Sequence, residues 1–262
     1  MKKTKIKRRV KRGIKRIRNT GLLIASFLRR PENLRYVPPW VGSLFSTEQH
    51  FSAHMPYLPY CVIGYLEKRL HPQTVAFEYG GGGSTLWLAK RVGSLTTVEH
   101  DACWFNSIQE EMRKAPDVNC TLLLREPQYE SASPSPSPGD SINYGSSMCP
   151  GSFEEYAKAI DPFPDSSFDL VLVDGRSRAA CLVHAAPKVR PGGLLVLDDS
   201  HREHYRPGMK TLRPWMRKDF WGIRPFRSKP GCCTCWTRPC PVGELTEGPM
   251  QSVEWTLGQL PV

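Results

Sequence analysis

The sequence lacks any apolar run long enough to cross a bilayer. The best candidate, GLLIASFL at Gly21 to Leu28, falls far short of the ~20 residues that a transmembrane helix needs. No secretory signal peptide is evident, because the basic start runs into an interrupted apolar patch. The nine cysteines are odd in number, and without an export signal they indicate free thiols in a reducing compartment. We therefore expect a cytoplasmic protein.

Residues 1–18 lack acidic side chains altogether but contain 11 Lys or Arg. The rest of the chain carries 25 basic and 25 acidic residues, so the net charge of +11 comes from this basic segment. Apolar residues recur at steps of three or four from Ile6 to Leu28, which predicts a basic amphipathic extension over 1–30. Such a segment can rest on an anionic membrane surface, peripherally, or bind RNA. A solvated extension and a transit peptide are the alternatives.

Residues 31–60 carry five prolines and many aromatic side chains, which indicates a loop-like arm or a lid over a pocket. A regular alternation of strands and helices then runs through a domain at 61–240, interrupted by a flexible insertion at 131–150. Strands are predicted at 74–79, 94–100, 119–124, 168–175 and 194–200. The tail at 241–262 shows no clear element.

This alternation predicts an α/β fold with a doubly wound, mostly parallel sheet. Two later runs, WGIRPF and CCTCWTR, are separated by a short link at 227–231 and predict a terminal antiparallel strand pair. The second run belongs to a stretch with four thiols at 232–240. Neighbours on a strand point to opposite faces, so we interpret these thiols as core and surface cysteines rather than a zinc site.

Four consecutive glycines follow the first predicted strand, in FEYGGGGST. A glycine-rich turn between a strand and a helix lets the backbone approach a ligand closely. A dinucleotide site needs Gly or Ala three residues after Gly82, where this chain has Thr85. Instead, Glu78 lies two residues before Gly80, and Glu99 closes the next strand. A carboxylate at that position can accept both hydroxyls of a ribose.

With these features the chain resembles class I S-adenosylmethionine-dependent methyltransferases, which have a Rossmann-like fold, over roughly residues 60–240. The resemblance rests on four segments in order: FEYGGGGST, TTVEHD, FDLVLVDGR and VRPGGLLVLDD. It implies an enzyme that uses S-adenosylmethionine. It also implies that Gly80 and Gly82 approach the methionine part of the cofactor, that Glu78 fixes the turn and that Glu99 holds the ribose.

The same resemblance places His100 beside the adenosine and Asp174 at the reactive end of the cofactor. Ser84, at the start of the helix after the glycines, is a further cofactor-binding candidate. These residues also have purely structural interpretations. Glu78 can be a buried acid satisfied by backbone amides, Asp174 can cap the next helix, and His100 can line the edge of the sheet.

Candidates for acid–base chemistry cluster after the fourth and fifth strands. Asp174, Asp199 and His201 are the candidate catalytic residues, because methyl transfer to a hydroxyl needs an aligned acceptor and a base. Asp174 with Asp198 and Asp199 is similar in outline to the divalent-cation site of some O-methyltransferases. The lysine that often follows the first acid is replaced here by Arg176, which weighs against a metal. We expect no metal site, with the cation-dependent mechanism as the alternative.

The D/N-P-P-Y/F motif of amino-methylating nucleic-acid enzymes is absent, since the fourth strand ends in VDGR. We therefore predict O-methylation of a small molecule or a sugar or glycan hydroxyl by in-line transfer. One alternative is an RNA-directed methyltransferase that uses the basic segment. The other is a non-catalytic protein with a cofactor-binding fold, anchored to a membrane surface or polyanion. The sequence leaves the oligomeric state open.

Overall fold

The computed structural model describes residues 30–46, 53–115, 119–129 and 141–240, together with residues 21, 23, 24, 27, 28 and 51. The basic segment, the first half of the predicted insertion and the tail at 241–262 lie outside these residues. In the part of the chain that is described, no helix is long and apolar enough to cross a membrane.

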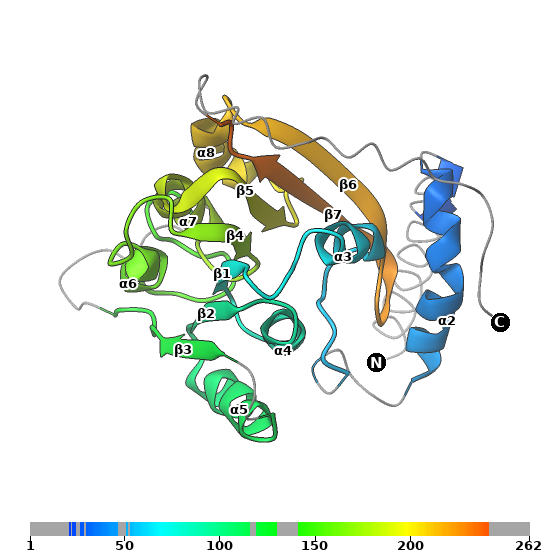
Figure 1. Cartoon of the computed structure of the whole chain (residues 1–262), viewed down its shortest axis with the longest axis horizontal. Coiled ribbons are helices and arrows are strands. Elements are labelled where there is room, and N and C mark those ends of the chain that lie inside the picture. The colour runs from blue at the N-terminus through cyan, green and yellow to red at the C-terminus, as the bar shows by residue number, and fades with distance from the viewer. Residues whose placement is uncertain are drawn as a thin grey trace, which may run out of the picture.

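A seven-stranded sheet forms the centre of the described chain (Figure 1). Its strands are β1 Val75–Tyr79, β2 Ser94–Glu99, β3 Cys120–Leu124, β4 Phe168–Val173, β5 Val189–Asp198, β6 Met216–Arg224 and β7 Arg227–Thr237. The order is β3-β2-β1-β4-β5-β7-β6. Strands β1 to β5 run parallel, and β7 is antiparallel to both β5 and β6. The predicted doubly wound sheet with a terminal antiparallel pair is confirmed.

Helices cover both faces of the sheet (Figure 1). The α-helices are α2 Val37–Phe45, α3 Tyr60–Glu67, α4 Gly83–Ala89, α5 Ala102–Arg113, α6 Glu154–Ala157, α7 Arg178–Ala185 and α8 Arg206–Met209. The 3-10 helices are η1 Pro31–Tyr36, η2 Lys158–Ile160, η3 Ala186–Lys188, η4 Glu203–Tyr205 and η5 Lys210–Leu212.

Two apolar cores lie on opposite faces of the sheet. Phe77 and Tyr79 of β1 belong to the core that includes residues of α6 and α7, whereas Ala76 belongs to the core that includes residues of α3 and α4. All three side chains are 0% exposed. This burial on both faces is what a central parallel strand requires, and it fixes the position of the turn that follows β1.

The structure differs from the loop predicted at 31–60, because η1 and α2 occupy residues 31–45. Pro31 lies in the first turn of η1 and Pro38 in the first turn of α2, where a missing N–H costs no helical hydrogen bond. The prolines therefore start helices instead of preventing them. This arm packs against the terminal strand pair, since Trp40 Nε1 donates to the Arg227 carbonyl at 2.7 Å and Asn33 Nδ2 to the Trp221 carbonyl at 2.8 Å.

The link between β6 and β7 also differs from the prediction, which placed it at 227–231. The strands instead turn at Pro225 and Phe226, and Phe226 adopts a left-handed φ of 59°. Gly231, which resembles a turn residue in the sequence, lies within β7. A Cβ there would lie 1.6 Å from Arg224 Nε, so the glycine makes room for a buried arginine. The cysteines of the chain are all free thiols, and Cys233 is buried.

Candidate active site

The carboxyl ends of the parallel strands open into one cleft of ≈ 840 Å³. In an open α/β sheet, ligands bind at this edge, beside the point where the strand order reverses, and here that point lies between β1 and β4. Most of the predicted site residues line this cleft: Gly80, Gly82, Ser84, Glu99, His100, Asp174, Asp198 and Asp199. Glu78 and His201 are not among its lining residues.

The glycine turn brings β1 and β4 into close contact. Gly80 has a positive φ of 90°, and a Cβ there would lie 2.6 Å from the Gly175 Cα. A Cβ on Gly175 would in turn lie 1.9 Å from the Tyr156 hydroxyl. The Gly80 N–H donates to the Val98 carbonyl at 2.9 Å, which continues the pairing with β2. A side chain at Gly80 would therefore be strained in conformation and would collide with backbone.

Glu78 is completely buried beneath this turn. Its Oε2 accepts hydrogen bonds from the hydroxyls of Thr85 at 2.6 Å and Thr97 at 2.9 Å, while its Oε1 has no hydrogen-bond partner among the described residues. The Thr85 hydroxyl also accepts from the Gly82 N–H at 2.9 Å. Burial raises the pKa of Glu78 to about 7, against the opposing effect of the Ser84, Thr85 and Thr97 hydroxyls. Thr85 thus connects the acid to the glycine turn. The threonine, which stands where a dinucleotide site has Gly or Ala, therefore has a structural role.

Glu99 at the end of β2 is only 3% exposed. It accepts from the Gly81 N–H at 2.9 Å, from the His100 N–H at 2.7 Å and from the Asp101 N–H at 2.9 Å, and the His100 Nδ1 lies 2.6 Å from its Oε1. Burial by itself would raise the pKa of Glu99, but the His100 ring and the backbone donors outweigh it and lower that pKa. A carboxylate offers about four lone-pair sites. A ribose would therefore displace at least one of the present donors, and the ribose role stays a prediction.

Two aromatic rings border this end of the cleft. His100 lies against Phe153, with 5.6 Å between ring centroids. Trp104 of α5 donates from Nε1 to the Gly81 carbonyl at 2.6 Å, and a Cβ on Gly82 would lie 3.7 Å from that nitrogen. The helical spacing of α5 indicates an inner apolar position for Trp104, but its indole lines the cleft and supports the glycine turn.

Asp174 directly follows β4, and Asp198 is the last residue of β5. Each of the two carboxylates is paired with arginine. Arg178 lies 2.9 Å from the Asp174 carboxylate and 3.4 Å from that of Asp198, and Arg224 lies 2.9 Å from Asp198. Arg178, Arg224 and Asp198 are buried, whereas the Asp174 side chain keeps 16% exposure at the cleft. Burial and the neighbouring Asp198 carboxylate raise the pKa of Asp174, although Arg178 and Arg224 oppose them.

Asp199 is held in the same network. Its carboxylate lies 2.7 Å from Arg224 and also pairs with Arg202, and its backbone adopts a left-handed φ of 52°. Burial would raise the pKa of Asp199, but Arg224 and Arg202 outweigh it and lower that pKa. His201 lies beyond this network, with its ring 6.3 Å from the Trp221 ring. Burial lowers the pKa of His201, with Asp199 opposing.

These carboxylates do not fit a divalent cation. Each of Asp174, Asp198 and Asp199 already has a guanidinium within ion-pair distance. Among the described residues, no group of three or more His, Cys, Asp or Glu side chains is arranged to hold a metal ion. A cation would have to compete with fixed positive charges for the same oxygens.

Sequence reasoning missed several residues of the cleft. They are Tyr57, Trp104, Arg178, Arg202, Arg224 and Arg227. Arg178 is four residues from Asp174 and Arg202 three residues from Asp199, so their closeness in sequence could have indicated both pairs. Nothing local relates Arg224 to Asp198, because their contact depends on the pairing of β7 between β5 and β6.

Comparisons with known proteins agree with this topology. No protein-family model matches the chain, and no curated protein matches it. The structure is similar to that of the O-methyltransferase TomG from Streptomyces achromogenes, solved with SAM, at 16% identity and a TM-score of 0.52 over 79% of this chain and 99% of that chain. It is also similar to an rRNA methylase from Streptococcus thermophilus, at 8% identity and a TM-score of 0.47 over 68% and 95% of the two chains. The chain has the Rossmann-like fold of the class I S-adenosylmethionine-dependent methyltransferases.

Proposed function

We propose that this chain is an S-adenosylmethionine-dependent methyltransferase that methylates a hydroxyl of a small molecule, sugar or glycan. The observation that carries the proposal is the arrangement of the cleft. The glycine turn at Gly80, the carboxylate of Glu99 and the carboxyl of Asp174 lie at the ends of three adjacent strands around one space. Its ≈ 840 Å³ falls within the usual range of about 300–1,000 Å³ for small-molecule sites.

The residues of the cleft fit this cofactor. The turn from Gly80 to Gly82 presents backbone without side chains, and the rings of His100 and Trp104 offer apolar faces for a purine. Glu99 would accept from a ribose hydroxyl in exchange for one of its present donors. When bound, S-adenosylmethionine would supply a methyl group on a sulfonium centre. Glu78 and Thr85 keep the turn in place from below.

Asp174 is the base that the geometry favours. It follows β4 directly, it faces the cleft, and its pKa is raised. A carboxyl group with a raised pKa accepts a proton from an acceptor hydroxyl more readily than an ordinary one does. Asp199 is less suited because Arg224 and Arg202 lower its pKa, and His201 lies outside the lining of the cleft. The roles of Asp199 and His201 stay predictions.

Calorimetry with S-adenosylmethionine tests the cofactor assignment. The wild type should bind, and Glu99→Ala should weaken binding about tenfold or more, because hydrogen bonds to a carboxylate contribute about 1.5–3 kcal/mol. Glu110→Ala is the matched control, since Glu110 is an exposed acid on α5 that pairs only with Arg113 in the described chain. Absence of binding by the wild type, or equal affinity in all three proteins, would contradict the assignment.

A methyl-transfer screen tests the acceptor. The full chain is incubated with labelled cofactor and sets of small-molecule hydroxyl compounds, glycans and RNA. Transfer to a hydroxyl compound that is lost in Asp174→Asn, with cofactor affinity retained, supports O-methylation with Asp174 as the base. Transfer confined to RNA would instead establish the RNA-directed alternative.

We further propose that the basic segment rests on an anionic membrane surface. The described residues that follow it include several exposed apolar side chains: Ile24, Leu28, Leu34, Leu44 and Phe45. Apolar groups beside a run of Lys and Arg suit a lipid surface better than RNA, which needs only the charges. Flotation with vesicles of anionic lipid should recover the full chain and lose it on deletion of residues 1–18. Equal flotation with neutral vesicles would contradict the proposal.

A further inference from the structure

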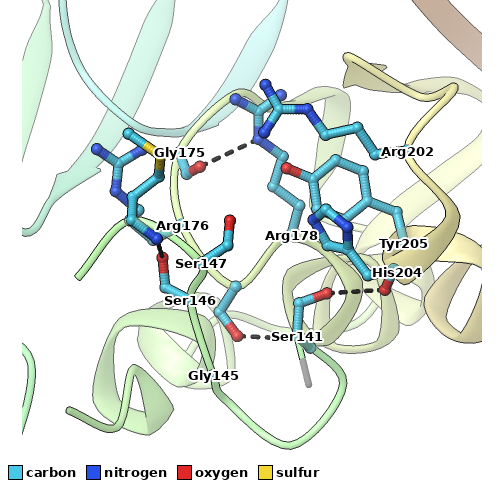
Figure 2. Close-up of a pocket in the computed structure, with 12 residues that line it drawn as sticks. Ser141, Gly145, Ser146, Ser147, Gly175, Arg176, Arg178, Arg202, His204 and Tyr205 are labelled. Carbon is cyan, nitrogen blue, oxygen red and sulfur yellow. Dashed lines mark hydrogen bonds between the residues drawn. The ribbon is translucent and has the colours of Figure 1, made fainter. Parts of the chain in front are cut away.

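A second, smaller pocket adjoins the cleft beside the turn after β4 (Figure 2). Its ≈ 100 Å³ is several times the minimum of about 10–15 Å³ that one water requires. The turn after β4, the segment at 141–148 and η4 form its walls. Three arginines line it, and no acidic side chain is found among its lining residues, in contrast to the cleft. The charged side chains that line the described pocket are therefore all basic.

Arg176 is the arginine of this pocket that lacks a counterion. Its guanidinium makes no ion pair or hydrogen bond with the described residues, and its Nε is buried without a partner. Arg178 and Arg202, by contrast, pair with Asp174 and Asp199. Arg176 lines both the pocket and the cleft. A partly buried cation without an anion is unfavourable, and an anionic ligand would relieve that cost.

Two further donors face the same space. Tyr205 is 5% exposed, and its hydroxyl has no hydrogen-bond partner in the described part of the chain. Burial raises the pKa of Tyr205, so this hydroxyl keeps its proton for donation. Ser146 is 7% exposed and accepts from the Met148 N–H at 3.3 Å, which leaves its own hydroxyl hydrogen free. Figure 2 shows Ser146 and Arg176 on one side of the pocket and Tyr205 on the other.

We propose that this pocket binds a phosphate group of the methyl acceptor, through Arg176, Ser146 and Tyr205. The inference rests on the proposed methyltransferase function and specifies its substrate class. Donors on two sides of one pocket suit a tetrahedral group with several oxygens better than a planar carboxylate.

The position of the pocket is also compatible with a small acceptor. Asp174 and Arg176 are separated by one residue, so their Cα atoms lie at most about 7 Å apart. A phosphate held by Arg176 and a hydroxyl beside Asp174 therefore lie within the reach of two side chains that start close together, and one small molecule can span that distance. A phosphorylated sugar or a comparable small phosphate ester has this spacing, whereas a long polymer is not required.

Titration of the full chain with inorganic phosphate at constant ionic strength tests the pocket. The wild type should bind phosphate, and Arg176→Gln should weaken the affinity about tenfold or more, because a hydrogen bond to a charged group contributes about 1.5–3 kcal/mol. Arg176→Lys should lose less, since it keeps the charge but not the planar fork. The control Arg206→Gln changes an arginine that is 71% exposed on α8, outside the pocket, and should bind like the wild type.

The outcomes separate this inference from the proposed function. Ser146→Ala provides a second, milder variant with an affinity loss of about fivefold, should Arg176→Gln fold poorly. No phosphate binding by the wild type, undiminished binding in the variants, or acetate binding as strong as phosphate binding overturns the phosphate site. S-adenosylmethionine affinity is measured in the same samples. Phosphate binding that depends on Arg176 without cofactor binding leaves the pocket standing and removes the methyltransferase proposal.

Discussion

Replacement of Glu78 by Gln should change how the stability of the protein depends on pH. The pKa of Glu78 is raised by burial from 4.5 to about 7 in the folded chain. The folded state therefore retains a proton that the unfolded state has lost between these two values. Because the folded pKa is the higher one, the contribution of Glu78 to stability is fully present below about pH 4.5 and is lost as the pH rises through about 7.

The size of this effect follows from the shift. A difference of about 2.5 pKa units at about 1.36 kcal/mol per unit gives a maximum of about 3.4 kcal/mol, of which about 2.5 kcal/mol falls between pH 5 and pH 8. Glu78→Gln cannot ionise, and its amide oxygen can still accept from the Thr85 and Thr97 hydroxyls. Relative to the wild type, the variant should therefore gain about 2.5 kcal/mol in unfolding free energy from pH 5 to pH 8.

Urea unfolding of both proteins at the two pH values measures this difference. Glu110→Gln is the control, because Glu110 lies exposed on α5 and should give a difference that hardly changes with pH. A Glu78→Gln difference that stays constant within about 0.5 kcal/mol would refute the reasoning. It would mean that Glu78 is ionised in the folded chain at neutral pH and that the unpartnered Oε1 is solvated in solution.

Three further predictions concern the cleft. Gly80→Ala should destabilise the fold by about 2–4 kcal/mol in urea unfolding, because the alanine would combine a left-handed φ with a backbone collision. The control Gly192→Ala has a left-handed φ but no close contact, so it should cost less. Arg224→Met should cost about 3–5 kcal/mol in the same assay, because it leaves the buried Asp198 carboxylate with one arginine instead of two. A change below about 1 kcal/mol would contradict this. The rate of methyl transfer should fall as the pH drops through the raised pKa of Asp174. The Asp174→Asn variant should reduce that rate about 10²–10⁴-fold. A variant that retains the rate would exclude Asp174 as the base.

The predictable part of this protein is the part in which neighbours in sequence are neighbours in space. The five parallel strands follow from continuous apolar runs between helical patterns, and each glycine or acid at a strand end must lie at the same edge of the sheet. Gly80, Glu99 and Asp174 can therefore be assigned to one cleft from the sequence alone. The directions in which their side chains point within the cleft cannot, as the donors that surround Glu99 show.

The less predictable part depends on chemistry that acts between distant segments. Pro31 and Pro38 read as breakers, because the sequence does not show that each begins a helix. Gly231 reads as a turn, because the sequence does not show that Arg224 passes over it. Proline still lacks its N–H and glycine still lacks a Cβ, as the sequence indicates. The surrounding structure decides whether the proline ends or starts a helix and whether the glycine forms a turn or makes room for a side chain.

The acidic cluster shows most clearly how such a contact changes an assignment. In the sequence, three aspartates at the ends of β4 and β5 match the outline of a cation site. In the structure each of them is paired with an arginine, which removes the match. Arg178 and Arg224 hold Asp198 from two sides, and between the cleft-lining carboxyls of Asp174 and Asp198, Asp174 keeps the greater exposure, 16% against 2%. A cation would have lowered the pKa of an acceptor hydroxyl directly. With guanidinium groups in that place, we propose that Asp174 itself takes the proton, and that Arg176, whose guanidinium has no partner among the described residues, binds an anion.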